Sequence, residues 1–281
     1  MVNTVSEFAP QKKFLVCVDS DGCAMDTMDI KHIRCFGPCM VDEWQLGQWQ
    51  EEILKRWNAI NLYTMTRGIN RFKGLAMALA EISEKYTPIG GIEDLVSWAE
   101  HAKELSNRAV AEEYDRTGKE VFRKALRWSE ATNRAIDALP ESEKRPFEGV
   151  AEGLAAMQEF ADVAVVSSAN RDAVEAEWQR YRLLEHVDVL LCQDAGSKAH
   201  CIEGLLGKGY DPHNVLMVGD APGDKAAAER NGVYFYPILV RHEAESWREL
   251  RATGLSHFQG QTYAIYGEHR NAEFLDNLKG E

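Results

Sequence analysis

Two kinds of hydrophobic pattern divide this chain. Short apolar runs, partly β-branched, occur five times, and each is typical of a buried strand. They cover residues 14–18, 163–166, 187–191, 215–218 and 233–238. After position 147 the runs alternate with helical stretches. This alternation predicts βα repeats and a parallel sheet that is covered by helices on both faces.

Between residues 30 and 146 the apolar side chains recur at steps of three and four, which indicates amphipathic helices. The clearest series are Leu46, Trp49, Ile53, Trp57 and Ile60; Phe72, Leu75, Ala76 and Leu79; Ile92, Leu95, Val96, Ala99 and Ala102; and Val121, Ala125, Trp128 and Thr132. Pro140 and Pro146 then break the helical pattern. After Val240 we expect short helices that pack on the core.

The first strand leads directly into two carboxylates, Asp19 and Asp21, followed by Gly22. Alternation along a strand would hold both carboxylates on one side, and the glycine allows a turn that aims them at one centre. Such a pair can supply a nucleophile and a proton carrier, and it favours a divalent cation. A strand that ends in an ordinary turn has the same residues, so this motif alone leaves both interpretations open.

Three more polar motifs follow apolar runs or open a helix: Ser167, Ser168 and Asn170; Lys198; and Gly219, Asp220 and Asp224. Taken singly, such residues are helix caps, solvated lysines or acids at a helix start. Together with Asp19 and Asp21, in this order, they resemble the four motifs of the haloacid dehalogenase-like hydrolase superfamily. The resemblance is to its capped phosphatases, in the phosphoglycolate phosphatase or β-phosphoglucomutase-like branch.

The resemblance implies an α/β fold with a Rossmann-like catalytic core at residues 1–29 and 147–281, and a helical cap domain inserted at 30–146. It implies that Asp19 attacks phosphorus and forms an aspartyl phosphate. Asp21 would protonate the leaving group and later activate water. Ser167 and Lys198 would bind the transferring phosphoryl group.

We expect the metal to be Mg²⁺, because a hard cation prefers oxygen ligands and bridges to phosphate. The family pattern implies that its ligands are the Asp19 carboxylate, the backbone carbonyl of Asp21, and Asp220. Asp224 would lie nearby, either holding a bound water or orienting Lys198.

The expected substrate is a small phosphorylated metabolite. Two alternatives remain: a sugar phosphomutase that uses the same intermediate, and a non-catalytic module that accepts a phosphoryl group. The presence of Asp21 argues against dehalogenation and phosphonate hydrolysis, which in this superfamily do not use an acid at that position.

The segment from Arg67 to Lys73 gathers three cations, an Asn and a Gly at an expected helix start. Arg67 and Arg71 are therefore candidates for gripping the leaving group when the cap closes, with Ser168 and Asn170 as further substrate contacts. The alternative interpretation is a solvated helix terminus with capping residues.

Composition limits the partners. A net charge of −13 argues against nucleic acid and anionic membranes, which repel an acidic surface. The sequence shows neither an export signal nor an apolar run of about eighteen residues, so we expect a cytoplasmic protein. Its expected state is a monomer or a homodimer. Cys35 and Cys39 form a weak redox or metal half-site, and we favour reduced, structural cysteines.

Overall fold

The computed structural model describes residues 1–279 of the chain. These residues form two compact units, which we call the sheet unit, Met1–Met28 with Ser142–Lys279, and the helical unit, Asp29–Glu141. The predicted α/β fold class is confirmed. That the sheet unit is the catalytic core and the helical unit its cap stays a prediction.

The sheet unit is built on five parallel strands in the order β5-β4-β1-β6-β7. Their bounds are β1 Phe14–Val18, β4 Ala161–Val166, β5 Val189–Leu191, β6 Val215–Gly219 and β7 Tyr234–Pro237. The central strand, β1, pairs with β4 and β6, and Val18 lies opposite both Val165 and Val218. The carboxyl ends of these three strands therefore meet at one edge of the sheet, where ligands of open α/β sheets bind.

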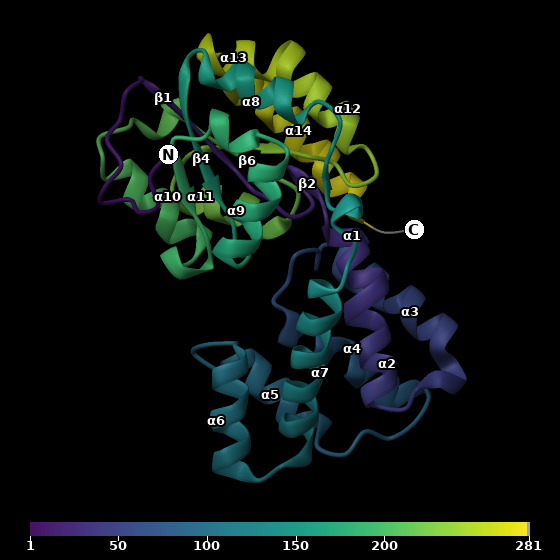
Figure 1. The fold of residues 1–281 in the computed structure, drawn as a ribbon. Coiled ribbons are helices and arrows are strands. Elements are labelled where there is room, and N and C mark those ends of the chain that lie inside the picture. The colour runs from purple at the N-terminus through teal and green to yellow at the C-terminus, as the bar shows by residue number, and fades with distance from the viewer. Residues whose placement is uncertain (280–281) are drawn as a thin grey trace. The chain divides into compact units, whose positions relative to one another are not determined.

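Helices cover both faces of this sheet, with α10 and α11 on the opposite side from α8, α12, α13 and α14 (Figure 1). The bounds are α8 Val150–Gln158, α9 Arg171–Arg180, α10 Lys198–Leu206, α11 Pro222–Arg230, α12 Glu243–Glu249, α13 Leu255–Gln259 and α14 Tyr263–Asn277. Val16 and Val18 of β1 share an apolar cluster with Leu154 of α8 and Trp178 of α9. Helix α14 has 15 residues, so it is longer than the short helices expected after Val240.

A two-stranded antiparallel ribbon follows the first acidic motif. Strand β2, Met25–Asp26, pairs with β3, Arg145–Pro146. The amide of Phe147 also donates to the carbonyl of Ala24 at 3.0 Å. The ribbon therefore ties the chain just after Asp21 to the segment where the chain re-enters the sheet unit.

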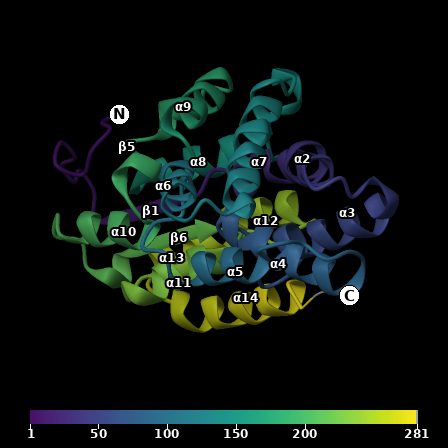
Figure 2. The ribbon, with the colours of Figure 1, turned by 90° about the horizontal axis from the view of Figure 1, so that it is seen from below.

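The helical unit packs around a separate aromatic core in which Trp57 and Trp128 are fully buried. The helices are α1 Met28–Lys31, α2 Gly37–Glu43, α3 Gln50–Asn58, α4 Arg71–Lys85, α5 Ile92–His101, α6 Asn107–Thr117 and α7 Glu120–Asp137, with π-helical turns at His32–Phe36 and Ala59–Tyr63. Helix α4 lies beside α5, and α2 beside α7 (Figure 2). The predicted series at 72–79, 92–102 and 121–132 are confirmed as α4, α5 and α7. The series from Leu46 to Ile60 is not one helix, because it is divided among a 3₁₀ turn at Gly47–Trp49, α3 and the π-helical turn at Ala59–Tyr63.

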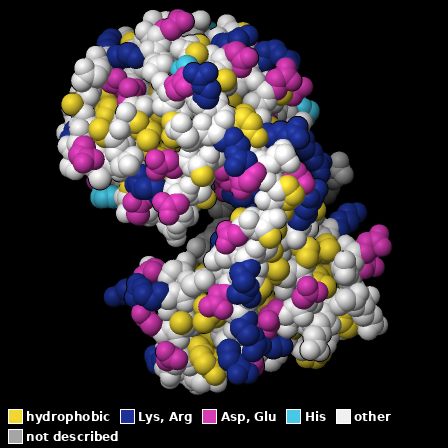
Figure 3. All heavy atoms as spheres, viewed as in Figure 1, with side chains coloured by type: hydrophobic (Ala, Val, Ile, Leu, Met, Phe, Trp, Pro, Cys, Tyr) yellow, Lys and Arg dark blue, Asp and Glu magenta, His cyan; other side chains and the backbone are white. Residues whose placement is uncertain are grey.

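The surface mixes charges of both signs. On the face seen in Figure 3, acidic and basic side chains are interspersed over both units. Within residues 1–279, none of the helices combines the length and apolar content needed to cross a membrane. All six cysteines are unbridged, and Cys39 is the one that is only partly buried.

Candidate active site

Asp19 follows the central strand directly and contacts a lysine from another element. Its amide donates to the carbonyl of Val218 at 3.0 Å, which fixes the backbone at the end of β1. Its Oδ2 lies 2.8 Å from Nζ of Lys198, at the start of α10. Asp19 is 5% exposed, so this contact is made almost entirely out of water.

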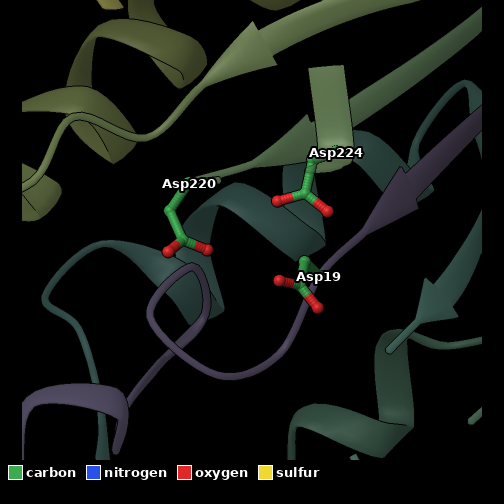
Figure 4. Close-up of side chains that lie close together, drawn as sticks. All are labelled: Asp19, Asp220 and Asp224. Carbon is green, nitrogen blue, oxygen red and sulfur yellow. The ribbon is translucent and has the colours of Figure 1, made fainter. Parts of the chain in front are cut away.

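Three carboxylates converge at this edge of the sheet (Figure 4). Asp19, Asp220 and Asp224 each offer an oxygen, and these oxygens lie within 4.8 Å of one another. All three side chains are buried, and Lys198 Nζ also contacts Asp224 Oδ1 at 2.5 Å. A buried cluster of three carboxylates offers hard oxygen donors, and such donors fit a hard divalent cation.

The residue before Asp220 leaves room for Asp224. A Cβ placed on Gly219 would lie 2.4 Å from Cβ and Cγ of Asp224, which is closer than packed atoms approach. The Asp224 carboxylate is further held by the amide of Ala221, which donates to Oδ2 at 3.0 Å. Asp224 therefore orients Lys198 through one oxygen and caps the start of α11 through the other.

The titration behaviour follows from this crowding. Burial raises the pKa of Asp19 well above its ordinary range; Lys198 opposes this shift, while Asp224 and Asp220 add to it. Burial alone would lower the pKa of Lys198, but the Asp19 and Asp224 carboxylates outweigh it and raise that pKa above its ordinary value. The lysine therefore stays charged. A further positive charge would favour the ionised form of Asp19.

Asp21 lies in the loop after β1, where Gly22 adopts a φ of 81°. The hydroxyl of Thr27 donates to Asp21 Oδ1 at 2.6 Å, and Thr27 is fully buried. The Gly22 amide closes the loop on the carbonyl of Met25 at 2.8 Å. Asp21 is only half-buried, so it remains open to solvent on one side.

Ser167 directly follows β4, the strand that pairs with β1, and its amide donates to the carbonyl of Leu191 at 2.9 Å. Its hydroxyl accepts from the amide of Ala169 at 3.1 Å. Ser168 is exposed. Asn170 caps α9 by accepting from the amides of Asp172 and Ala173 at 3.0 and 3.3 Å. Of the two further expected substrate contacts, Asn170 thus has a clear structural task.

The two arginine candidates belong to the helical unit. Arg67 is 2% exposed, and its Nη1 donates to the carbonyl of Leu62 at 2.8 Å. Arg71 donates to Ser129 Oγ at 3.0 Å and Asn133 Oδ1 at 2.7 Å, and burial lowers its pKa from the ordinary value. The partners of Arg71 are neutral, so its positive charge is not offset within these bonds.

Asn70 between them accepts from the amide of Phe72 at 2.9 Å and caps α4. The alternative interpretation was a solvated helix terminus with capping residues. Its capping part is confirmed by Asn70, whereas Arg67 is buried and not solvated.

Several contacts at the site had no sequence signal. Thr27 on Asp21, the indole of Trp178 on Ser20 Oγ at 2.9 Å, and the clearance at Gly219 all depend on the folded chain. For the clearance at Gly219, the sequence gives one hint: a glycine directly precedes Asp220, and glycine alone lacks the Cβ that would clash.

Comparison with known proteins gives the class. A sequence profile described as haloacid dehalogenase-like hydrolase matches residues 92–238. This range is more than half of the chain and contains Ser167, Lys198 and Asp220. The protein therefore belongs to the haloacid dehalogenase-like hydrolase family. No curated protein sequence matches the chain significantly.

Solved structures match most of this chain at low identity. One from Lactobacillus delbrueckii subsp. bulgaricus, provisionally named a phosphoglycolate phosphatase, is 16% identical with a TM-score of 0.50, and the match covers 80% of this chain and 85% of that one. A predicted phosphatase from Clostridium acetobutylicum is 13% identical with a TM-score of 0.48, covering 81% and 85%. CbbY from Rhodobacter sphaeroides, in complex with phosphate, is 14% identical with a TM-score of 0.43, covering 81% and 87%.

Proposed function

We propose that this protein is a Mg²⁺-dependent phosphomonoester hydrolase that acts on a small phosphorylated metabolite through an aspartyl phosphate. The observation that carries the proposal is the buried Asp19 carboxylate at the end of the central strand, 2.8 Å from Lys198 and grouped with two further carboxylates. Family membership makes hydrolysis the expected reaction class.

In the first step an Asp19 oxygen attacks phosphorus, and the bond from phosphorus to the leaving oxygen breaks. Asp21 gives its proton to that oxygen. In the second step water attacks phosphorus, Asp21 takes the water proton, and the Asp19 carboxylate is released with inorganic phosphate. Dividing a slow hydrolysis into two displacements lowers each barrier. The Thr27 hydroxyl supports this role by fixing one oxygen of Asp21.

Lys198 and Ser167 serve the phosphoryl group. The ammonium group offsets charge on the equatorial oxygens, and Asp224 holds it in place. The Ser167 hydroxyl lies at the end of the strand adjacent to β1. Asp19, Asp220 and the backbone carbonyl of Asp21 would hold the Mg²⁺, with Asp224 next to them. When bound, the cation supplies positive charge that neutralises the phosphate and the carboxylates.

The neutral partners of Arg71 support a role in substrate recognition. A guanidinium without a carboxylate partner in those bonds retains its capacity to attract an anionic or polar leaving group. Arg67 is the weaker candidate, since its Nη1 already serves a backbone carbonyl and lies 3.9 Å from Asp29.

The test is a panel of metabolite phosphates assayed with Mg²⁺, with Asp19→Asn beside the wild type. We expect Asp19→Asn to reduce turnover by on the order of 10⁴-fold or more while the fold is kept, because the amide is not nucleophilic but has nearly the same volume. Asp194→Asn is the matched control, because Asp194 pairs with Arg171 at the surface of the same unit. Turnover that is retained in Asp19→Asn would reject the proposal. So would wild-type activity that is the same with and without a chelator.

A further inference from the structure

The loop that follows β1 is organised around Ser20, the residue between Asp19 and Asp21. The carbonyl of Ser20 accepts from three amides, those of Cys23, Ala24 and Met25, at 3.3, 2.9 and 2.8 Å. Ser20 is fully buried. Because it stands between Asp19 and Asp21, its backbone torsions set the direction in which both carboxylates leave the chain.

Two tryptophans from distant helices hold this loop. Nε1 of Trp178, on α9, donates to Ser20 Oγ at 2.9 Å. Nε1 of Trp247, on α12, donates to the carbonyl of Cys23 at 2.9 Å. Both indoles are fully buried within the apolar cluster of the sheet unit. In such surroundings a donor that loses its acceptor costs about 1–3 kcal/mol, so each indole strongly favours its present partner.

Trp178 and Lys198 contact the end of β1 from opposite sides. Val16 and Val18 pack in the same cluster as Trp178, and the Ser20 side chain contacts the indole of Trp178. Asp19 has the opposite parity and contacts Lys198. The chain end of β1 is therefore held on both faces, by an ion pair on one and by an indole hydrogen bond on the other.

The second indole has little room to move. A Cβ placed on Gly153 of α8 would lie 2.7 Å from Cε3 of Trp247, and one on Gly149 would lie 3.3 Å from its Cβ. Helix α8 thus approaches Trp247 as closely as glycine permits. An indole packed in this way is a rigid support for the Cys23 carbonyl, at the far end of the turn that begins at Ser20.

We propose that Trp178 is a positioning residue: through the Ser20 hydroxyl it sets the orientation of the Asp19 and Asp21 carboxylates, while Trp247 holds the rest of the loop at Cys23. This inference rests on the proposed function, because it takes Asp19 and Asp21 as the reacting groups. Neither indole contacts substrate. Trp178 would act on how precisely the nucleophile and the acid are oriented, and a small misplacement of reacting groups lowers the rate strongly.

The test is Trp178→Phe, which keeps an aromatic ring and removes the donor. With p-nitrophenyl phosphate and Mg²⁺ we expect kcat to fall by roughly ten- to a hundredfold, as for reacting groups displaced by about 1 Å. KM should change little, because neither indole is proposed to contact substrate, so the loss should fall on kcat alone.

Tyr263→Phe is the matched control. The Tyr263 hydroxyl is a buried donor to the carbonyl of Phe235 at 2.9 Å, in the same unit but on the edge strand. This control should lower the unfolding temperature by a similar amount and keep the wild-type kcat and KM. A kcat in Trp178→Phe equal to wild type, or an equal loss of kcat in Tyr263→Phe, would overturn the inference.

Ser20→Ala tests the same bond from its acceptor side, and it applies even where Trp178→Phe does not fold. The double variant Ser20→Ala/Trp178→Phe should lose no more kcat than the more damaging single variant, since one bond is removed in each case. Multiplied losses would contradict the proposed path through Ser20. Asp19→Asn separates the two proposals. If it retains turnover, the proposed function fails; if it is inactive while Trp178→Phe and Ser20→Ala keep full kcat, only the positioning role fails.

Discussion

The two units use charge in opposite ways. In the sheet unit Asp19, Asp220 and Asp224 are buried together, and Lys198 offsets only part of their charge. In the helical unit most of the ion pairs lie at the surface, as between Arg56 and Glu81, whose side chains are 50% and 29% exposed. Arg67, buried 3.9 Å from Asp29, is an exception. Exposed pairs contribute little to stability, whereas a buried excess of charge opposes folding. The difference supports the proposed site at this edge of the sheet, because a buried excess of charge costs stability and is retained where the proposed chemistry requires it.

The largest effect on this contrast is expected from Lys198→Met. Removing Lys198 takes away the cation that contacts both Asp19 and Asp224, and we expect a loss of about 3–5 kcal/mol in the free energy of unfolding, together with loss of activity. Urea unfolding in the presence of a chelator measures it. Lys119→Met is the control, because Lys119 pairs with Asp94 at the surface of the helical unit and should cost less than about 1 kcal/mol.

The same variant has a predictable pH dependence. Burial raises the native-state pKa of Asp19 above its unfolded value, so between the two values the native state binds more protons than the unfolded state. Stability therefore decreases as the pH rises through that window. Without Lys198 the native pKa is higher still. The deficit of Lys198→Met should be smaller at pH 5 than at pH 8, and a deficit independent of pH would contradict the charge explanation.

A smaller and more local effect is expected from Gly219→Ala. The new Cβ would overlap Asp224 and must displace it, which costs about 1–3 kcal/mol and moves the partner of Lys198. We expect activity to fall by roughly ten- to a hundredfold while the fold remains. Gly223→Ala, in α11, is the control, because a Cβ there has no neighbour within 4 Å. Equal activities of the two variants would show that the position of Asp224 does not depend on the absence of a Cβ at Gly219.

The smallest effect is expected from Glu81→Gln in the helical unit. The hydrogen bond from Arg56 lowers the pKa of Glu81, so the pair stabilises the fold above the unfolded pKa and loses this contribution as the pH falls through the native one. At neutral pH the substitution should cost less than about 1 kcal/mol, and the cost should disappear in acid. Thermal unfolding at both pH values checks it. A cost as large as that of Lys198→Met would remove the distinction between the two units.

The sheet was predictable because buried parallel strands are continuous apolar runs, and the five runs lie where the strands are. The convergence of Asp19, Lys198, Asp220 and Asp224 was predictable for a related reason, because residues at the carboxyl ends of parallel strands share an edge. Helix α6 was not predicted, since Val110 is its only buried residue and the helix carries few large apolar side chains.

The supporting contacts of the site were beyond sequence reasoning. Ser20 and Trp178 are separated by 158 positions, and no period or motif relates them. Arg67 was also indistinguishable from a solvated cation in the sequence, because its burial depends on how the turn after Ala59–Tyr63 folds back on Leu62. Motifs record what a site needs at the reacting atoms, while the packing that holds those atoms depends on the whole fold.

The position of β1 has a consequence for synthesis on the ribosome. This strand pairs with β4 and β6, and both of these follow the entire helical unit in the chain. A nascent chain therefore carries an apolar strand with unmet backbone partners until residue 166 has emerged, while the intervening helices, rich in local contacts, are already able to form. Asp19 is synthesised early and the residues that surround it late, so the apolar strand Phe14–Val18 is open to pairing with other chains while the polypeptide grows.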